Sequence, residues 1–339
     1  MSYYKVVTIE KYKKEQSKQI LKTMEQKRQS TLNQVMDYFT EKYGCASIPS
    51  FSAFIPAIAL ARQCYQQKQS YEEGFSEPRR FEIKREHLLG YPEHRTRVLD
   101  LLKENAQVLT ARFYGLHDSQ IDVKKVELMT RGSSSPLSLE IAIHNGEART
   151  IRKVCYVKPF DINRLIGIEI YSQLSGAVQD YQFVATRDTI VEDGVYGNHE
   201  FEYEPNELMR IKGSELYRAG KINLDVLSFL MGLDDTAKLD NFVVSPEGRI
   251  RVVDFDVLDR DYTPDEQAYI RDLTAHELGI SKVQYDDIYR MQEAFITQNM
   301  LRHRESITRL ATIMRVSSIP ELKQAGMRIC ASIENLIKA

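Results

Sequence analysis

A short stretch around residue 250 constrains the fold of this chain more than any other. Residues 242 to 244 and 250 to 253 are apolar runs, and the turn-forming residues 245 to 248 (Ser-Pro-Glu-Gly) lie between them. Two such runs around a tight turn predict a β-hairpin. Asn241 precedes the first run and Asp254 follows the second, so the hairpin would hold both side chains at its open end.

The side chains at this open end carry the oxygen atoms that Mg²⁺ prefers, and Mg²⁺ usually bridges to phosphates. Asp254 ends a nearly continuous apolar strand, where a carboxylate is costly unless it is paired or binds a cation. Asn241, Asp254 and Asp256 therefore predict a metal site for phosphoryl transfer. Two alternatives stay open: Asn241 could cap a turn, and Asp256 could pair with Lys158.

The segment resembles the protein kinase superfamily. It is similar to the catalytic loop (HRDxxxxN) and the DFG motif of that family, with Asn241 as the metal-binding Asn and Asp254-Phe255 as the start of DFG. Thr236 stands where the family has its catalytic Asp, and Asp256 stands where it has the Gly of DFG. Both departures resemble atypical and bacterial effector kinases.

The general base stays open between neighbouring acids. Asp235 and Asp234 lie one and two residues before Thr236, and Asp240 is a third acid on the same loop. An acid placed there could accept the proton of an attacking hydroxyl. Lys238 resembles the catalytic-loop Lys that neutralises the transferring phosphoryl group, although a solvated lysine is an equal reading.

Upstream, the order of expected elements matches a kinase core. Lys158 would hold the nucleotide phosphates, with Lys153 as a competing candidate, and Glu169 would pair with Lys158. The expected elements are strands over residues 126 to 129, 137 to 143 and 148 to 157, a helix over 163 to 179, a strand over 183 to 191, and helices over 205 to 217 and 222 to 232.

A loop of small residues separates the first two of these strands. Its residues Gly132, Ser133 and Ser134 would offer backbone N–H groups to the phosphates. An ordinary turn explains them equally well, because the loop lacks the several glycines of the family pattern.

These elements predict an α+β, bilobal protein-kinase-like fold. A helical extension would occupy residues 1 to 115, a small β-rich N-lobe 116 to 204, and a reduced helical C-lobe with C-terminal helices 205 to 339. Within the extension, we expect helices over residues 8 to 42, 54 to 73 and 94 to 112, and a polar, basic loop between the last two.

The segment after Asp256 has no Ala-Pro-Glu ending, so an ordinary activation segment and its control by phosphorylation are not expected. Instead, Thr263, Pro264 and Glu266 predict the start of a helix, with an N-cap Thr, Pro at the first position and Glu at the third.

Composition narrows the class of protein. The net charge is -2 and the pI is near 6.4, so no nucleic-acid partner is expected. The 4 cysteines lack metal or redox spacing, which is typical of a reducing compartment. With no apolar signal core and no apolar run long enough for a bilayer, we expect a cytoplasmic protein. The resemblance also implies secretion into a host cytosol as a bacterial effector.

Basic residues gather in clusters that could grip a phosphate-rich ligand. A solvated charged face is the commoner explanation for such runs. Because some bacterial effector kinases need a highly phosphorylated inositol, the resemblance implies an inositol polyphosphate or phosphoinositide activator. The candidate residues are Arg79, Arg80, Lys84, Arg85, Arg302 and Arg309.

The leading hypothesis is an atypical kinase that uses ATP and Mg²⁺ or Mn²⁺ to phosphorylate Ser or Thr of a protein substrate. A kinase for a lipid or a small molecule is the rival of the same fold. A pseudokinase, which binds nucleotide or a partner without catalysis, is favoured by Thr236. Transfer of AMP is a further alternative, since a fold does not fix the chemistry.

Overall fold

The computed structural model of this chain divides, by its internal contacts, into two compact units. Unit 1 consists of Met1–Tyr38, Ile162–Val178 and Gly197–Ala339, and unit 2 of Phe39–Asp161 and Gln179–Tyr196. The residues that the structure describes are 2–43, 48–71, 80–82, 84, 93–129, 137–144, 150–176, 183–186, 188–194, 198–231, 241–253 and 262–338.

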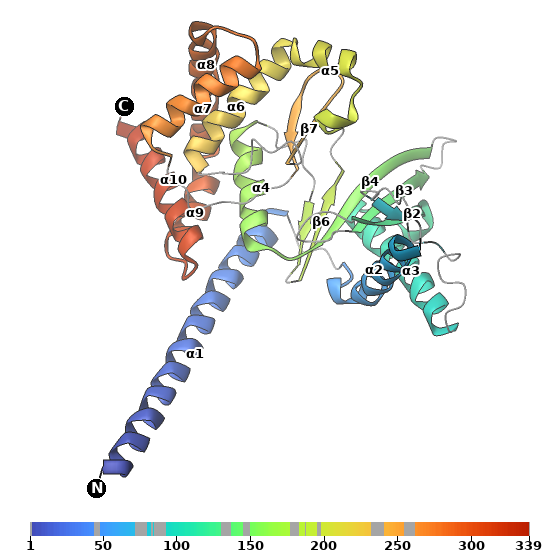
Figure 1. The fold of residues 1–339 in the computed structure, drawn as a ribbon, viewed down its shortest axis with the longest axis vertical. Helices are drawn as coiled ribbons and strands as arrows, with labels where there is room; N and C mark the ends of the chain where they lie inside the picture. Colours follow the sequence, from blue (N-terminus) through green and yellow to red (C-terminus); the bar gives the residue numbers. More distant parts are fainter. Residues whose placement is uncertain are drawn as a thin grey trace. The chain divides into compact units, whose positions relative to one another are not determined.

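Unit 2 is built on a six-stranded antiparallel sheet with strand order β1-β2-β3-β4-β6-β5. Strands β2, β3, β4 and β6 of this sheet are labelled in Figure 1. Neighbours in the sequence are neighbours in the sheet except at β6, which pairs with β4 and leaves β5 at the edge. The strands are β1 (Arg80–Glu82), β2 (Ile121–Met129), β3 (Leu137–His144), β4 (Thr150–Pro159), β5 (Phe183–Ala185) and β6 (Thr189–Asp193).

Two helices of unit 2, α2 (Ile55–Tyr71) and α3 (Glu93–Tyr114), pack on this sheet. Their buried apolar side chains form one core with those of the strands, including Ile58 of α2, Leu109 of α3 and Leu139 of β3. This division differs from the predicted boundary between residues 115 and 116, because helices assigned to an extension share their core with the strands that follow them.

The sheet differs from the predicted one in two places. The expected strand over residues 183 to 191 is two strands, β5 and β6, which pair with each other through Phe183↔Glu192. The basic loop contains a further strand, β1, whose Arg80 lies opposite Met129 of β2. The expected strands over residues 126 to 129, 137 to 143 and 148 to 157 are confirmed as β2, β3 and β4.

Unit 1 is mainly helical and contains one two-stranded hairpin of β7 (Phe242–Val244) and β8 (Ile250–Val252). Its core includes the fully buried side chains of Tyr217 and Tyr285. The helices are α1 (Ser2–Tyr43, of which residues up to Tyr38 belong to unit 1), α4 (Ile162–Leu174), α5 (Pro205–Lys212), α6 (Glu215–Met231), α7 (Pro264–Glu277), α8 (Lys282–Arg302), α9 (Arg304–Arg315) and α10 (Pro320–Lys338).

Local sequence explains how several of these helices begin and where they pack. Thr263 caps α7, accepting a hydrogen bond from the N–H of Glu266 whose side chain returns to Thr263, as predicted. In α1, residues 17 to 30 are exposed and the buried positions begin at Thr31. Within the described part of the chain, no helix has both the length and the apolar character needed to cross a bilayer.

The structure therefore confirms the α+β class and the predicted order of elements. Strands β2, β3 and β4 precede helix α4, strands β5 and β6 follow it, and helices α5 and α6 precede the hairpin β7–β8. This is the order that the resemblance to kinases implies.

Candidate functional site

The hairpin β7–β8 places Asn241 at its open end. Phe242 pairs with Val252, and the N–H of Val253 donates a 2.8 Å hydrogen bond to the carbonyl oxygen of Asn241. Asn241 is half-buried. The predicted hairpin is confirmed. Asp254 lies outside the described residues, so the convergence of its side chain with that of Asn241 stays a prediction.

The closed end of the hairpin requires a glycine. The N–H of Gly248 donates to the carbonyl of Ser245 at 2.8 Å, and the N–H of Ser245 donates to the carbonyl of Arg249 at 2.9 Å. Gly248 has a φ of 95°, and a Cβ added there would lie 2.1 Å from Oγ of Ser214. A side chain is thus excluded at this position, and the turn fixes the register of the two strands.

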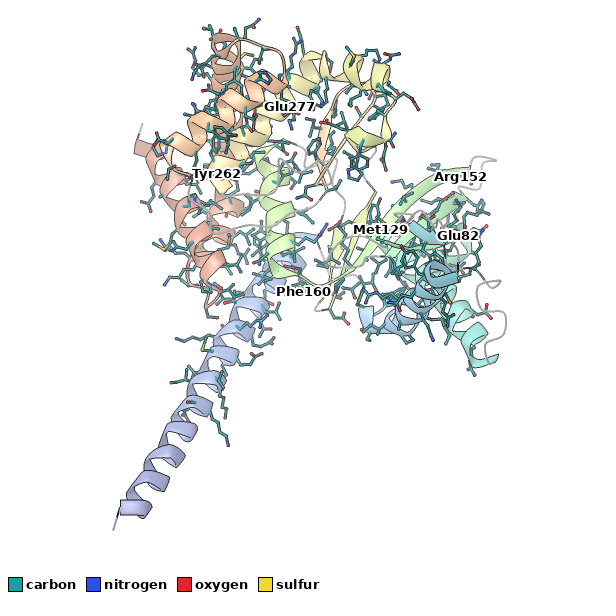
Figure 2. All side chains as sticks on the ribbon, in the orientation of Figure 1. Glu82, Met129, Arg152, Phe160, Tyr262 and Glu277 are labelled. Carbon is teal, nitrogen blue, oxygen red and sulfur yellow. The ribbon has the colours of Figure 1, made fainter. Side chains whose placement is uncertain are left out.

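Two side chains of unit 1 hold the first strand of the hairpin. Nδ1 of His199 lies 2.8 Å from the carbonyl oxygen of Phe242. The buried ammonium of Lys221 lies 4.9 Å from the centre of the Phe242 ring and 3.7 Å from Glu277, the last residue of α7 (labelled in Figure 2). The strand that follows Asn241 is therefore held through both its backbone and its side chain.

A third contact reaches the open end of the hairpin from α4. Arg164, in the first turn of α4, is 7% exposed, and its Nη2 donates a 2.8 Å hydrogen bond to the carbonyl oxygen of Val253. The guanidinium thus holds the carbonyl group of Val253, the residue with which the described part of the hairpin ends. Sequence reasoning missed this residue; its only signal is an arginine among the apolar residues of α4.

Glu169 lies in the middle of α4 and is fully buried (0% exposed). A buried carboxylate needs hydrogen-bond donors, and Oε1 accepts them from the phenol of Tyr38, at 3.0 Å, and from the amide of Gln173. Burial, and then the carboxylate of Glu169, raise the pKa of Tyr38. The phenol therefore stays protonated and serves as the hydrogen-bond donor. Its neighbours in the helix are buried as well, since every side chain from Arg164 to Leu174 is buried.

Lys158 lies near the end of β4 in unit 2 and is 7% exposed. Its Nζ is 2.8 Å from Oε2 of Glu192, a residue of β6 that sequence reasoning missed, and 5.7 Å from the centre of the Tyr156 ring. An ammonium buried to this extent requires a partner charge. Lys158 and Glu169 belong to different units, and their predicted pairing stays a prediction.

The competing candidate Lys153 is half-buried, with its Nζ 4.9 Å from the centre of the Tyr114 ring.

Among the described residues, no group of three or more His, Cys, Asp or Glu side chains could hold a metal ion. Many predicted site residues lie outside the described residues, namely Gly132, Ser133, Ser134, Asp234, Asp235, Lys238, Asp254 and Asp256.

The predicted basic residues fall in both units. In unit 2, Arg80 belongs to β1 and the exposed Lys84 forms an ion pair with Glu82 at 3.3 Å. In unit 1, Arg302 ends α8 and the guanidinium of Arg309, on α9, lies 5.5 Å from the centre of the Tyr38 ring. Arg79 and Arg85 lie outside the described residues.

No protein-family profile matches the chain, and no curated protein sequence does either. The structure is similar to the solved FAT and kinase domain of CtTel1, with a TM-score of 0.45 and 13% sequence identity over 84% of this chain and 26% of that chain. This chain thus spans about a quarter of that one.

A second similar structure comes from the Shewanella oneidensis MR-1 toxin–antitoxin system HipA, HipB and its operator DNA complex. Its TM-score is 0.33 and its identity 13%, over 89% of this chain and 82% of that chain. Both TM-scores are too low to say what this chain binds or does.

Proposed function

We propose that this chain is an ATP-dependent phosphotransferase of the atypical kinase kind, using Mg²⁺ or Mn²⁺. The observation that carries the proposal is the 2.8 Å hydrogen bond from the N–H of Val253 to the carbonyl of Asn241. It holds the backbone of Asn241 beside that of Val253, the residue that precedes Asp254 in the chain. The amide and carboxylate oxygens of Asn241 and Asp254 fit the donor set of a hard divalent cation. Such a cation would neutralise charge on the nucleotide phosphates.

The chain's own residues supply the remaining roles. Lys158 would bind phosphate oxygens, since its ammonium is buried and lies in an ion pair with Glu192. Glu169, the predicted partner of Lys158, would orient it. Asp235 or Asp234 would accept the proton of the attacking hydroxyl, and Asp256 would assist at the metal.

We further propose that the acceptor is Ser or Thr of a protein and that the enzyme works in a cytoplasm, its own or that of a host. The backbone of Gly132, Ser133 and Ser134 would cradle the phosphates, and Lys238 would meet the transferring group. An inositol polyphosphate or phosphoinositide would activate the enzyme through the basic residues around Arg79 and Arg309.

The test uses ATP labelled on the γ- or the α-phosphate, with Mg²⁺ or Mn²⁺ and with or without a eukaryotic extract. We expect γ label to enter protein, and Asp254→Ala and Asn241→Ala to abolish its entry. The matched control is Asp272→Ala, which removes an exposed acid of α7 outside the motif and should transfer like the wild type.

Other results would replace the proposal. Label from the α position would mean AMP transfer, and γ label entering only lipid or small molecules would mean the rival kinase class. Thr236, at the position of the usual catalytic Asp, favours a pseudokinase. That function would be accepted if ATP raised the melting temperature of the protein and no label moved.

The proposed activator has its own test. Inositol hexakisphosphate should increase transfer by the wild type, and reversing the charge at Arg79 and Arg80 should remove the increase. Equal activation of this variant and the wild type would exclude these two residues as its site.

A further inference from the structure

Helix α4 is tied to its surroundings in unit 1 at both ends. In its first turn, Nη2 of the buried Arg164 donates to the carbonyl of Val253, 2.8 Å away. At its last residue, the carbonyl of Leu174 accepts a 3.0 Å hydrogen bond from Nδ2 of Asn299, a buried residue of α8. The two ties restrict how far α4 can slide along its axis.

A third tie, halfway along, restricts rotation of α4 about its axis. Oε1 of Glu169 accepts hydrogen bonds from Tyr38 of α1, at 3.0 Å, and from Gln173. Oγ of Ser306, on α9, donates to Oε1 of Gln173 at 2.6 Å. The phenol of Tyr38 is thus the point where α1 enters a chain of hydrogen bonds that runs from α1 through α4 to α9.

The hydrogen bond from Tyr38 is suited to hold α4 firmly. Tyr38 and Glu169 are both buried, and a hydrogen bond to a charged acceptor in a dry environment is stronger than one exposed to water. Arg164 lies five residues before Glu169, so about 7.5 Å of rigid helix joins the two side chains. A rotation of α4 that releases Glu169 must therefore also move Arg164 and the carbonyl of Val253 that it holds.

We propose that Tyr38 is a positioning residue for the metal-binding segment, acting through α4 and Arg164 on the peptide group before Asp254. The proposal rests on the function proposed above and deepens it, since it makes the end of α1 part of the site's support. In this view α1 has two parts, an exposed stretch over residues 17 to 30 and a final part whose tyrosine sets the position of α4.

The experiment measures the Mg²⁺ concentration that gives half-maximal phosphoryl transfer by the full chain. Because Tyr38→Phe removes one hydroxyl and keeps the ring, this concentration should rise about fivefold while the amount of folded protein is unchanged. Arg164→Gln should raise it by at least as much. Since both residues act along one path, the double variant should be no worse than Arg164→Gln alone.

Tyr285→Phe is the matched control. The phenol of Tyr285, which is also fully buried, donates a 2.7 Å hydrogen bond to a carboxylate, Asp225, but this pair joins α8 to α6. Its half-maximal Mg²⁺ concentration should stay at the wild-type value. An unchanged value in Tyr38→Phe, an equal rise in Tyr285→Phe, or multiplied effects in the double variant would each overturn the proposal.

A second readout separates this proposal from the proposed function. Without nucleotide or metal, Tyr38→Phe should speed hydrogen exchange of peptides covering residues 162 to 174 and 241 to 253, and Tyr285→Phe should not. Unchanged exchange in Tyr38→Phe overturns the role of Tyr38 whether or not the enzyme is active. A wild type that transfers no phosphoryl group, with the expected exchange pattern, overturns only the phosphotransferase function and leaves the support of Val253 by Tyr38 in place.

Discussion

Two clusters of unit 1 share one local arrangement, a buried tyrosine whose phenol donates to a carboxyl group. In the first, Tyr38 donates to Glu169 at 3.0 Å; in the second, Tyr285 donates to Asp225 at 2.7 Å. Burial raises the pKa of both tyrosines, and the neighbouring carboxylate raises it further, so both phenols remain donors.

The two clusters differ in what they connect. The Asp225 cluster joins α6 to α7 and α8, since Thr274 of α7 donates to the same carboxyl group and Lys221 lies close to it. The Glu169 cluster joins α1 to α4 and α9, and the first turn of α4 holds the backbone of Val253. The same arrangement therefore serves helix packing in one place and supports the end of the hairpin in the other.

Replacing each carboxyl group by an amide should separate these roles most clearly. Glu169→Gln keeps an acceptor for Tyr38 but removes the charge proposed to orient Lys158, so phosphoryl transfer should fall roughly a hundredfold. Asp225→Asn makes the same chemical change in the other cluster. This variant should transfer phosphoryl groups at a rate within about threefold of the wild type, because a packing change away from the candidate site acts mainly on stability. The measurement is the initial rate of γ-phosphate transfer at saturating ATP.

Equal losses in the two variants would remove the distinction between the clusters. Circular dichroism of both variants would first establish that each is folded. A Glu169→Gln variant that is folded and fully active would show that this carboxylate acts only in packing.

The course of the chain is largely predictable from the sequence because local signals decide it. The turn at 245 to 248 predicts the hairpin, and Thr263 with Glu266 predicts the start of α7, since both depend on neighbouring residues. The break between β5 and β6 is not predictable in this way. It lies at Asp188, which accepts a hydrogen bond from Ser50, a partner 138 residues away in the chain.

In the candidate site too, contacts between residues close in sequence could be predicted, and contacts between distant residues could not. Asn241 could be placed at the open end of the hairpin because the strand that sets it there is only a few residues away. The roles of Arg164 and Tyr38 could not be predicted, since their acceptors are 89 and 131 residues distant. Nothing in a local pattern tells which buried carbonyl or carboxylate such a side chain will meet.

The Asp225 cluster should make stability depend on pH. Burial raises the pKa of Asp225 to about 6, above its ordinary value of 3.8, despite the opposing hydrogen bonds of Tyr285 and Thr274. The folded state then binds the proton of Asp225 more tightly than the unfolded state does. The stability that this protonation contributes is complete below about pH 4 and is lost as the pH rises through 6. Because the residue is only half-buried and solvent screens the charge, Asp225→Asn should be more stable than the wild type by about 1–2 kcal/mol at neutral pH.

Urea unfolding of both proteins over a series of pH values measures this difference. The two free energies of unfolding should converge on the acid side of the titration. A difference that stays constant over the whole series would show that Asp225 titrates alike in the folded and unfolded states.

Removing the hydroxyl group of Tyr285 should change the free energy of unfolding less, and should also shift its pH dependence. Tyr285→Phe loses one part-buried hydrogen bond, which should lower the free energy of unfolding by about 1 kcal/mol. Because that hydrogen bond lowers the pKa of Asp225, its loss should move the titration to higher pH. The same urea series applied to Tyr38→Phe should show a similar loss of stability but no shift of the titration. An identical shift in Tyr38→Phe would contradict the assignment of the titration to Asp225 and its hydrogen bond with Tyr285.

The smallest effect is expected from an exposed ion pair that joins two of the same helices. Asp272 of α7 lies 2.8 Å from Nζ of Lys282 of α8, and the side chains are 59% and 65% exposed. The hydrogen bond and charge of Asp272 raise the pKa of Lys282, but water screens the pair and offsets what the contact contributes. Asp272→Asn should therefore leave the melting temperature unchanged at low and at high salt. If it lowered the melting temperature as much as Tyr285→Phe, contact geometry rather than burial would set the strength of the links between these helices, and the Glu169 cluster would have to be judged by its geometry alone.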